Sequence, residues 1–167
     1  DGIEFEAAEK KVKSDISGLI NNDGDVPVDD FHRRLGLIMW NKCGMSRNEQ
    51  GLKEAIQEIQ ELRKEFYLRV SIPGVSNDFN PELEKALRVA DFIELGEAMC
   101  VDALDRRESC GGHFREESQT EDGEALRDDE NYKFVSAWEY TGSPSEAKLH
   151  KEDLVYDNIE LKQRSYK

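Results

Sequence analysis

The sequence predicts a mainly α-helical protein, with an up-down-up three-helix bundle, one further helix before it and a small β extension at the C-terminus. Three observations predict this class. Apolar residues recur at spacings of three and four along four segments, as they do on one face of an amphipathic helix. The last of these segments is long, so its partners must be long too, which favours antiparallel helices. An aromatic, β-branched stretch near the C-terminus indicates strand.

The composition sets limits on the function. The chain has 167 residues, enough for one domain with a core, and 37% of them are hydrophobic. Its formal net charge is −14, which disfavours nucleic acid and anionic membranes as partners. No apolar run approaches the roughly 20 residues that span a bilayer, so direct membrane insertion is not expected.

Cysteine usage and the start of the chain indicate the cellular context. Cys43, Cys100 and Cys110 form no C-x-x-C pair, so we expect no disulfide framework and a reducing cytoplasm. There is no secretory signal at the start. The chain begins at Asp1, and its first turn already has helical character. We therefore expect a piece of a longer or processed protein.

The first two helices are predicted from their apolar spacing. The segment 4–20 has a single apolar stripe, and the sequence "NNDGDVP" then ends the helix. The segment 29–44 has Phe31, Leu35 and Ile38 on one face. Because Leu37 and Trp40 add apolar surface on other sides, we expect this second helix to be buried on most of its circumference. The stripe of the first helix consists of Phe5, Ala8, Val12, Ile16 and Leu19.

The next two helices carry start signals. Ser46 and Glu49 have the spacing of a capping box before a stripe that ends at Phe66. Asn80 is the expected N-cap of the longest helix, and Pro81 suits its first position. We expect this helix to run to about Arg107, with the glycine pair 111–112 as its stop. Its predicted stripe consists of Leu83, Leu87, Ala90 and Ile93.

The composition changes after the glycine pair. The acidic stretch 116–130 is predicted to be a solvated loop with a short helical turn. In "YKFVSAWEY" the residues Phe134, Ser136, Trp138 and Tyr140 alternate with their neighbours, which indicates a strand. The segment 141–153 is predicted to be a loop, and 154–166 a second strand. The predicted division is a helical bundle domain at 1–112 and a C-terminal extension at 113–167.

The stretch "RRESCGGHFREE", residues 106–117, concentrates polar chemistry and admits three interpretations. Cys110 and His113 supply only two of the four ligands that zinc requires. An activated thiol at Cys110 is disfavoured because the negative end of a helix dipole raises a thiol pKa. The interpretation that holds most weight is structural, a helix end that forms a joint with another surface.

Several motifs resemble a known family. "RRESCGGHFREE" followed by "RDDENY" resembles the R-x-E-S-R-G-A-H-x-R … R-D-D motif in the C-terminal region of succinate dehydrogenase and fumarate reductase flavoprotein subunits, and L-aspartate oxidase has a related form. "FHRRLGLIMWNKCGMSRNEQGLKEAI", with its W…G…R pattern, resembles the preceding helices, and "ELGEAMCVDALDRRES" the last bundle helix. The closing "RSYK" resembles the C-terminal tail. Cys110 and Gly112 stand where many members have Arg and Ala, and 116–126 resembles an insertion.

The resemblance implies a spectrin-repeat-like bundle followed by a smaller extension with strands. It implies FAD in the intact subunit, which interconverts succinate and fumarate. The implied partners are the FAD-binding and capping domains of the same subunit, an iron–sulfur subunit, and indirectly a cytochrome b membrane anchor and quinone. The implied location is cytoplasmic, peripheral to the inner face of the bacterial membrane.

The family's flavin and dicarboxylate residues have no counterpart in this sequence, which also lacks a G-x-G-x-x-G fingerprint. We therefore assign no catalytic, cofactor-binding or metal residue, and expect the chain alone to be inactive and to bind no cofactor. The residues that match the family motif are assigned to an interdomain joint: Arg107, Glu108, Ser109, His113 and Arg115. Two alternatives remain, a stand-alone acidic helical interaction module and a thiol- or metal-dependent enzyme centred on Cys110 and His113.

Overall fold

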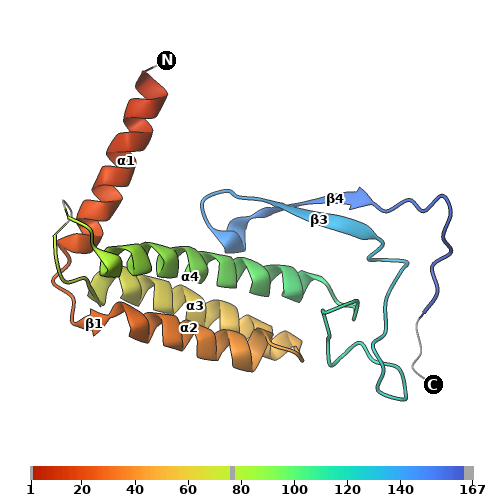
Figure 1. Cartoon of the computed structure of the whole chain (residues 1–167). Helices are drawn as coiled ribbons and strands as arrows, with labels where there is room; N and C mark the ends of the chain where they lie inside the picture. The colour runs from red at the N-terminus through yellow and green to blue at the C-terminus, as the bar shows by residue number, and fades with distance from the viewer. Residues whose placement is uncertain (1, 76–77, 164–167) are drawn as a thin grey trace. The chain divides into compact units, whose positions relative to one another are not determined.

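The computed structural model describes residues 2–75 and 78–163, and within these it has four α-helices and two small sheets (Figure 1). The predicted fold class is confirmed: a mainly α bundle with a preceding helix and a small β extension. The closing "RSYK" lies outside the described residues. The helices are α1 Ile3–Ile20, α2 Val28–Cys43, α3 Glu49–Arg69 and α4 Pro81–Asp105. The shorter elements are β1 Val26–Pro27, β2 Val70–Ser71, β3 Phe134–Glu139, β4 Lys148–Asp153 and the 3₁₀ turn η1 Pro144–Glu146.

The contacts divide the chain into two compact units. The first consists of Asp1–Gly36 and Ile59–Ile93, and the second of Leu37–Glu58 and Glu94–Lys167. Each of α2, α3 and α4 therefore contributes one half to each unit. No helix in the described part of the chain is both long and apolar enough to cross a membrane.

The core of the first unit fixes the direction of its three helix halves. Phe31 of α2 meets Phe66 of α3 edge to face, with ring centroids 5.2 Å apart. The start of α2 thus packs on the end of α3, so these two helices are antiparallel. Asp29 of α2 and Lys85 of α4 form an ion pair at 3.4 Å, which places the starts of those two helices together. This is the up-down-up order that the sequence predicts.

A two-residue parallel bridge also joins β1 to β2 in the first unit, a feature that the sequence pattern does not predict. Val26 pairs with Val70, and Pro27 with Ser71. Gly24 precedes this bridge, where a Cβ atom would lie 2.3 Å from the carbonyl oxygen of Arg69. The close approach of the two backbones therefore requires glycine at this position.

The second unit has an antiparallel hairpin fastened to α4. The six residues of β3 pair with those of β4, so that Phe134 lies opposite Asp153. The Trp138 indole donates to Asp102 at 2.7 Å. The Ser145 hydroxyl donates to Glu97, a carboxylate that is fully buried. A hairpin alone is marginal, and these two bonds to α4 give it a support.

Two predicted helix ends are wrong. The N-cap of α3 is Asn48, whose Oδ1 accepts from the Gly51 N–H at 2.7 Å, while the Ser46 hydroxyl donates to Glu116 instead. The predicted capping box does not form because the Ser46 hydroxyl bonds to Glu116 of the acidic stretch. Helix α4 ends at Asp105, before Arg107, so the glycine pair follows the helix without terminating it.

The predicted buried faces also need correction. Leu37 and Trp40 on α2 are 56% and 79% exposed, so this helix buries one face only. The Phe5 and Val12 side chains on α1 are exposed too, and only Leu19 of its stripe is buried. On α4 the buried row differs from the predicted one because apolar residues occur on two sides of the helix. That buried row comprises Ala86, Val89, Ile93, Glu97, Cys100 and Ala103.

The C-terminal prediction is half right. The first predicted strand is confirmed as β3, with alternating burial. Its partner β4 forms from the residues predicted to be a loop, and the described part of 154–166 contains no strand. The acidic stretch is closed by a bridge between Gln119 and Ala125, and it ends in a single helical turn in which the Asn131 and Tyr132 N–H groups donate to the Asp128 carbonyl oxygen. The apolar residues of "LVYDNIEL" suggested a strand at 154–166. The short connection 140–147 instead returns the chain directly onto β3, so the residues that follow it form β4.

Candidate functional site

The stretch after α4 closes the end of that helix with an arginine from further along the chain. Arg115 is 2% exposed, and its Nη1 donates to the carbonyl oxygens of Ala103 at 2.9 Å and Arg106 at 3.3 Å. Its Nε donates to Glu117 at 3.1 Å. The last carbonyls of a helix have no partner within the helix and carry partial negative charge. The Arg115 guanidinium donates hydrogen bonds to these carbonyl oxygens, and its positive charge offsets their partial negative charge.

Ser109 holds Arg115 in place through its backbone. The Ser109 hydroxyl accepts from the Arg115 N–H at 2.8 Å and donates to the Arg115 carbonyl at 3.2 Å. Between them, Cys110 and His113 exchange two backbone hydrogen bonds, at 2.8 and 3.0 Å. Gly111 has φ 59° in this turn, a conformation that favours glycine. The serine and the turn thus set the position of the arginine.

His113 bridges two helix ends. Its Nδ1 lies 2.7 Å from Arg47 Nη1, and its Nε2 lies 2.8 Å from the Arg106 carbonyl oxygen. Arginine only donates and a carbonyl only accepts, so the imidazole is neutral and carries its proton on Nε2. Burial lowers the pKa of His113, and the nearby charges of Arg47 and Arg115 lower it further. The lowered pKa therefore favours the neutral imidazole, which is the form that these two hydrogen bonds require.

Arg47 closes the end of α2 in the same manner as Arg115 closes α4. Its Nε donates to the carbonyl oxygens of Cys43 at 3.1 Å and Gly44 at 3.2 Å. One arginine therefore satisfies each helix end, and His113 links the two.

Glu108 and Arg106 attach the start of β3 to the end of α4. Glu108 is 3% exposed, and its two oxygens accept from Arg106 Nη1 at 2.7 Å and from the Asp128 N–H at 2.9 Å. Arg106 also donates to the carbonyls of Tyr132 and Phe134, both at 3.1 Å, and lies over both rings. A buried carboxylate is stable here because each oxygen has a donor.

The structure brings together four of the five residues assigned to the joint, namely Glu108, Ser109, His113 and Arg115. Arg107 is different because its side chain is exposed, and only its carbonyl is fixed, by the Ser118 hydroxyl at 2.6 Å. Sequence reasoning missed Arg47 and Arg106 as members of this cluster. Arg47 had a signal, the W…G…R pattern, whereas Arg106 was assigned to the last turn of a helix that ends before it.

The geometry opposes thiol chemistry at Cys110. A catalytic cysteine requires a base with a nitrogen free to take its proton. The two ring nitrogens of His113 are engaged by Arg47 and the Arg106 carbonyl, so this imidazole cannot serve Cys110. Among residues 2–75 and 78–163, no three His, Cys, Asp or Glu side chains gather as metal ligands.

The glycine pair after α4 does not have the setting of a dinucleotide-binding turn. A pyrophosphate binds where glycines open a helix, at its positive N-terminus. Gly111 and Gly112 follow the C-terminus of α4, where the partial charge is negative.

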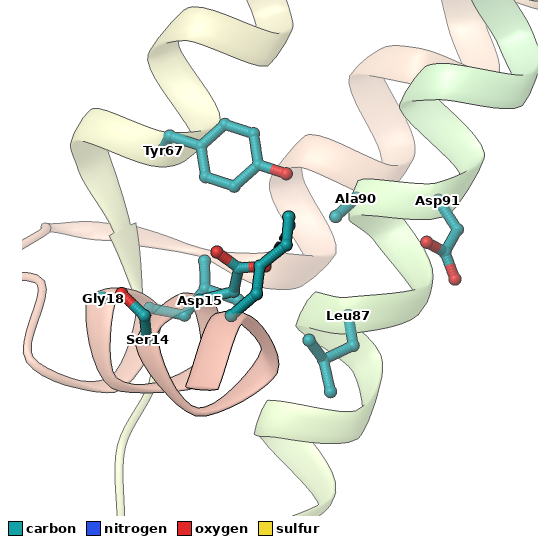
Figure 2. Close-up of a pocket in the computed structure, with 9 residues that line it drawn as sticks. Ser14, Asp15, Gly18, Tyr67, Leu87, Ala90 and Asp91 are labelled. Carbon is teal, nitrogen blue, oxygen red and sulfur yellow. Dashed lines mark hydrogen bonds and ion pairs between the residues drawn. The ribbon is translucent and has the colours of Figure 1, made fainter. Parts of the chain in front are cut away.

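A surface pocket of about 580 Å³ lies in the first unit between α1, α3 and α4. Figure 2 shows Ser14, Asp15 and Gly18 from α1 on one side, Leu87 and Ala90 from α4 on another, and the Tyr67 ring between the helices. Asp15 is already paired with Lys11 at 2.7 Å. The lining contains no histidine or cysteine and gathers no catalytic pair.

Comparison with known proteins decides the family. Residues 32–166 match the family described as fumarate reductase flavoprotein C-term. The chain belongs to this family. The fumarate reductase flavoprotein subunit of Escherichia coli K12 is 30% identical over 128 residues, which cover 77% of this chain and 20% of that protein. The Helicobacter pylori 26695 subunit is 34% identical over 113 residues, 66% of this chain and 15% of that protein.

The fold is shared with solved structures of the family. A chain of E. coli quinol fumarate reductase superposes with a TM-score of 0.81 at 25% identity, covering 97% of this chain and 27% of that one. The chain thus corresponds to the C-terminal domain of such flavoprotein subunits and spans about a fifth of the length of the curated relatives it matches.

Proposed function

We propose that this chain is the C-terminal helical domain of a flavoprotein subunit that interconverts succinate and fumarate, and that it braces the FAD-binding domain without contributing a catalytic residue. The match of residues 32–166 to the family carries this proposal. The residues after α4 support it, because Glu108, Ser109, His113 and Arg115 are engaged with one another and with backbone groups in a fixed structural cluster.

The interdomain joint comprises Arg107, Glu108, Ser109, His113 and Arg115. Four of these side chains are engaged within the cluster and give the loop a fixed shape. Arg107 and the exposed turn 110–112 are then the parts presented to the rest of the subunit. On this basis the joint connects the helical domain to the FAD-binding domain, and the chain itself consists of a helical bundle, residues 1–112, and a C-terminal extension, residues 113–167.

The intact subunit is proposed to hold FAD in its other domains, to contact the capping domain, and to pass electrons to an iron–sulfur subunit. A cytochrome b anchor and quinone follow indirectly, with the subunit on the cytoplasmic side of the membrane. Similarity to structures named quinol fumarate reductase supports this kind of assembly. A stand-alone interaction module is not favoured by the same comparisons.

The proposal is tested first on the 167-residue chain. We expect no visible flavin absorbance after purification and no succinate turnover with a dye acceptor. Bound flavin or turnover would contradict the proposal. The reading frame upstream of Asp1 supplies an independent test, since it is expected to continue into a glycine-rich FAD fingerprint.

The joint is tested in the complete subunit. Arg107→Ala is expected to lower flavin retention and thermal stability of the subunit, because Arg107 is the exposed charge of the joint. Arg33→Ala is the matched control, since its guanidinium is 70% exposed and Arg33 belongs to the first unit, whereas the joint belongs to the second. Equal behaviour of the two variants would remove Arg107 from the interface.

A further inference from the structure

Helix α1 has an apolar stripe that the described residues leave largely uncovered. Phe5 is 75% exposed and Val12 55% exposed, Ala8 between them is exposed, and Leu19 near the end of the helix is buried. These residues follow one another at spacings of three, four and seven, so they lie on one side of the helix. The stripe is therefore packed at its C-terminal end and open to solvent along the first turns.

The side of α1 that faces α4 is a different one. Figure 2 shows Ser14 and Gly18 of α1 across the pocket from Leu87 of α4. With 3.6 residues per turn, Ser14 and Gly18 point about 120° or more away from Val12 around the helix. The packing of α1 within the first unit thus leaves the exposed part of the stripe available to another surface.

Charged residues flank the stripe on both sides. Glu9 and Lys13 form an ion pair along one edge, and Lys11 and Asp15 form another along the opposite edge. All four side chains are more than half exposed. An apolar centre with a charged rim is the composition of a protein interface, and a helix that stays in water has no need of the apolar centre.

The length of the relatives indicates what covers this stripe. The solved E. coli chain superposes on 97% of this chain, whereas this chain covers only 27% of that one. The uncovered part of this chain is shorter than the 18 residues of α1, so a counterpart of α1 belongs to the shared fold. Because the matched family is the C-terminal region of the flavoprotein, most of such a subunit precedes this region.

We propose that the stripe of Phe5, Ala8 and Val12 docks on an apolar surface of the FAD-binding domain that precedes α1 in the same polypeptide. This inference rests on the proposed function and adds a second contact to the joint. The joint residues belong to the second unit and α1 belongs to the first. Each unit therefore has its own contact with the preceding domain.

A contact within one polypeptide suits a stripe of this size. Its exposed part spans about two turns of helix, far less than the roughly 800 Å² per partner that a stable interface between separate proteins buries. A tethered domain loses little translational freedom when it docks, so fewer contacts suffice. Two copies of this chain would instead bring together two net charges of −14.

The test compares two sides of α1 in the complete subunit, with the variants Val12→Cys and Lys10→Cys. Lys10 points away from the stripe, and both side chains are exposed in this chain, so an uncovered helix would react equally at both positions. We expect the thiol at position 12 to react with an alkylating reagent at least about tenfold more slowly than the thiol at position 10. Mass spectrometry of the α1 peptide measures both rates without interference from other cysteines.

Flavin absorbance of the unaltered subunit, measured in parallel, separates this inference from the proposed function. Equal reaction at positions 12 and 10 in a subunit that holds flavin overturns the docking of α1 and leaves the proposed function standing. A complete subunit without flavin contradicts both. Protection of position 12 that disappears when the subunit is diluted places a second copy on the stripe, and this outcome also overturns the inference.

Discussion

The two ends of α4 are closed in opposite ways. At the start, the cap is local: Asn80 Oδ1 accepts from the Leu83 N–H at 3.0 Å, and Pro81 occupies the first helical position. At the other end, the cap comes from Arg115, which lies ten residues beyond Asp105. A local cap needs only the right residue beside the helix. A remote cap exists only if the turn that carries it folds, so the two ends respond differently to mutation.

Of the three changes, replacement of Arg115 should lower the free energy of unfolding most. Arg115→Ala removes the guanidinium donor from the Ala103 and Leu104 carbonyl oxygens of α4, and we expect a loss of about 3 kcal/mol in the free energy of unfolding. Urea denaturation of the chain measures it. Arg115→Lys should recover only part of the loss, because a single ammonium cannot reach both the carbonyls and Glu117. Arg33→Ala is the control, and a loss equal to that of Arg115→Ala would refute the role of the remote cap.

Loss of the local cap should have a smaller effect. Asn80→Ala removes the acceptor of the Leu83 N–H, and we expect destabilisation of about 1 kcal/mol in the same denaturation experiment. Asn80→Ser should stay close to the parent because serine also caps. If Asn80→Ala were more costly than Arg115→Ala, the contrast between the two ends would be wrong.

The smallest effect should be a pH dependence at the remote cap. Burial lowers the pKa of His113 in the folded state, so the unfolded chain binds its proton more readily. The contribution of this group is therefore complete above its ordinary pKa of about 6.5 and is lost as the pH falls through the lowered folded value. His113→Gln should show a weaker loss of stability than the parent between neutral and mildly acidic pH.

Thermal unfolding as a function of pH measures this effect. His150→Gln is the matched control, because that histidine lies exposed on β4. Identical pH profiles for the parent and His113→Gln would show that the ring does not titrate between the two arginines.

Sequence reasoning performed best where a signal and its effect lie within one helical turn. Asn80 and Pro81 predicted the start of α4, and the alternation from Phe134 predicted β3. It failed where two residues far apart compete for one partner. Ser46 has the spacing of a capping box, yet its hydroxyl bonds to Glu116, seventy residues later in the chain.

The candidate site shows the same division. Its members Glu108, Ser109, His113 and Arg115 could be identified by their resemblance to a family motif, and the glycines of the turn by their type. The burial and the contacts of each side chain could not be predicted from that motif. Arg107 and Arg106 are adjacent and chemically identical, but one is exposed and the other lies over the rings of Tyr132 and Phe134.

The sequence by itself determined the helices, the first strand, the family and the stretch in which the polar residues concentrate. Those features follow from periodicity, local capping and the order of motifs, which are properties of neighbouring residues. Only the tertiary structure decided which face of α4 is buried, which arginine closes which helix end, and that His113 is neutral. These outcomes depend on burial and on hydrogen bonds between residues far apart in the chain, and such partners do not exist until the chain folds.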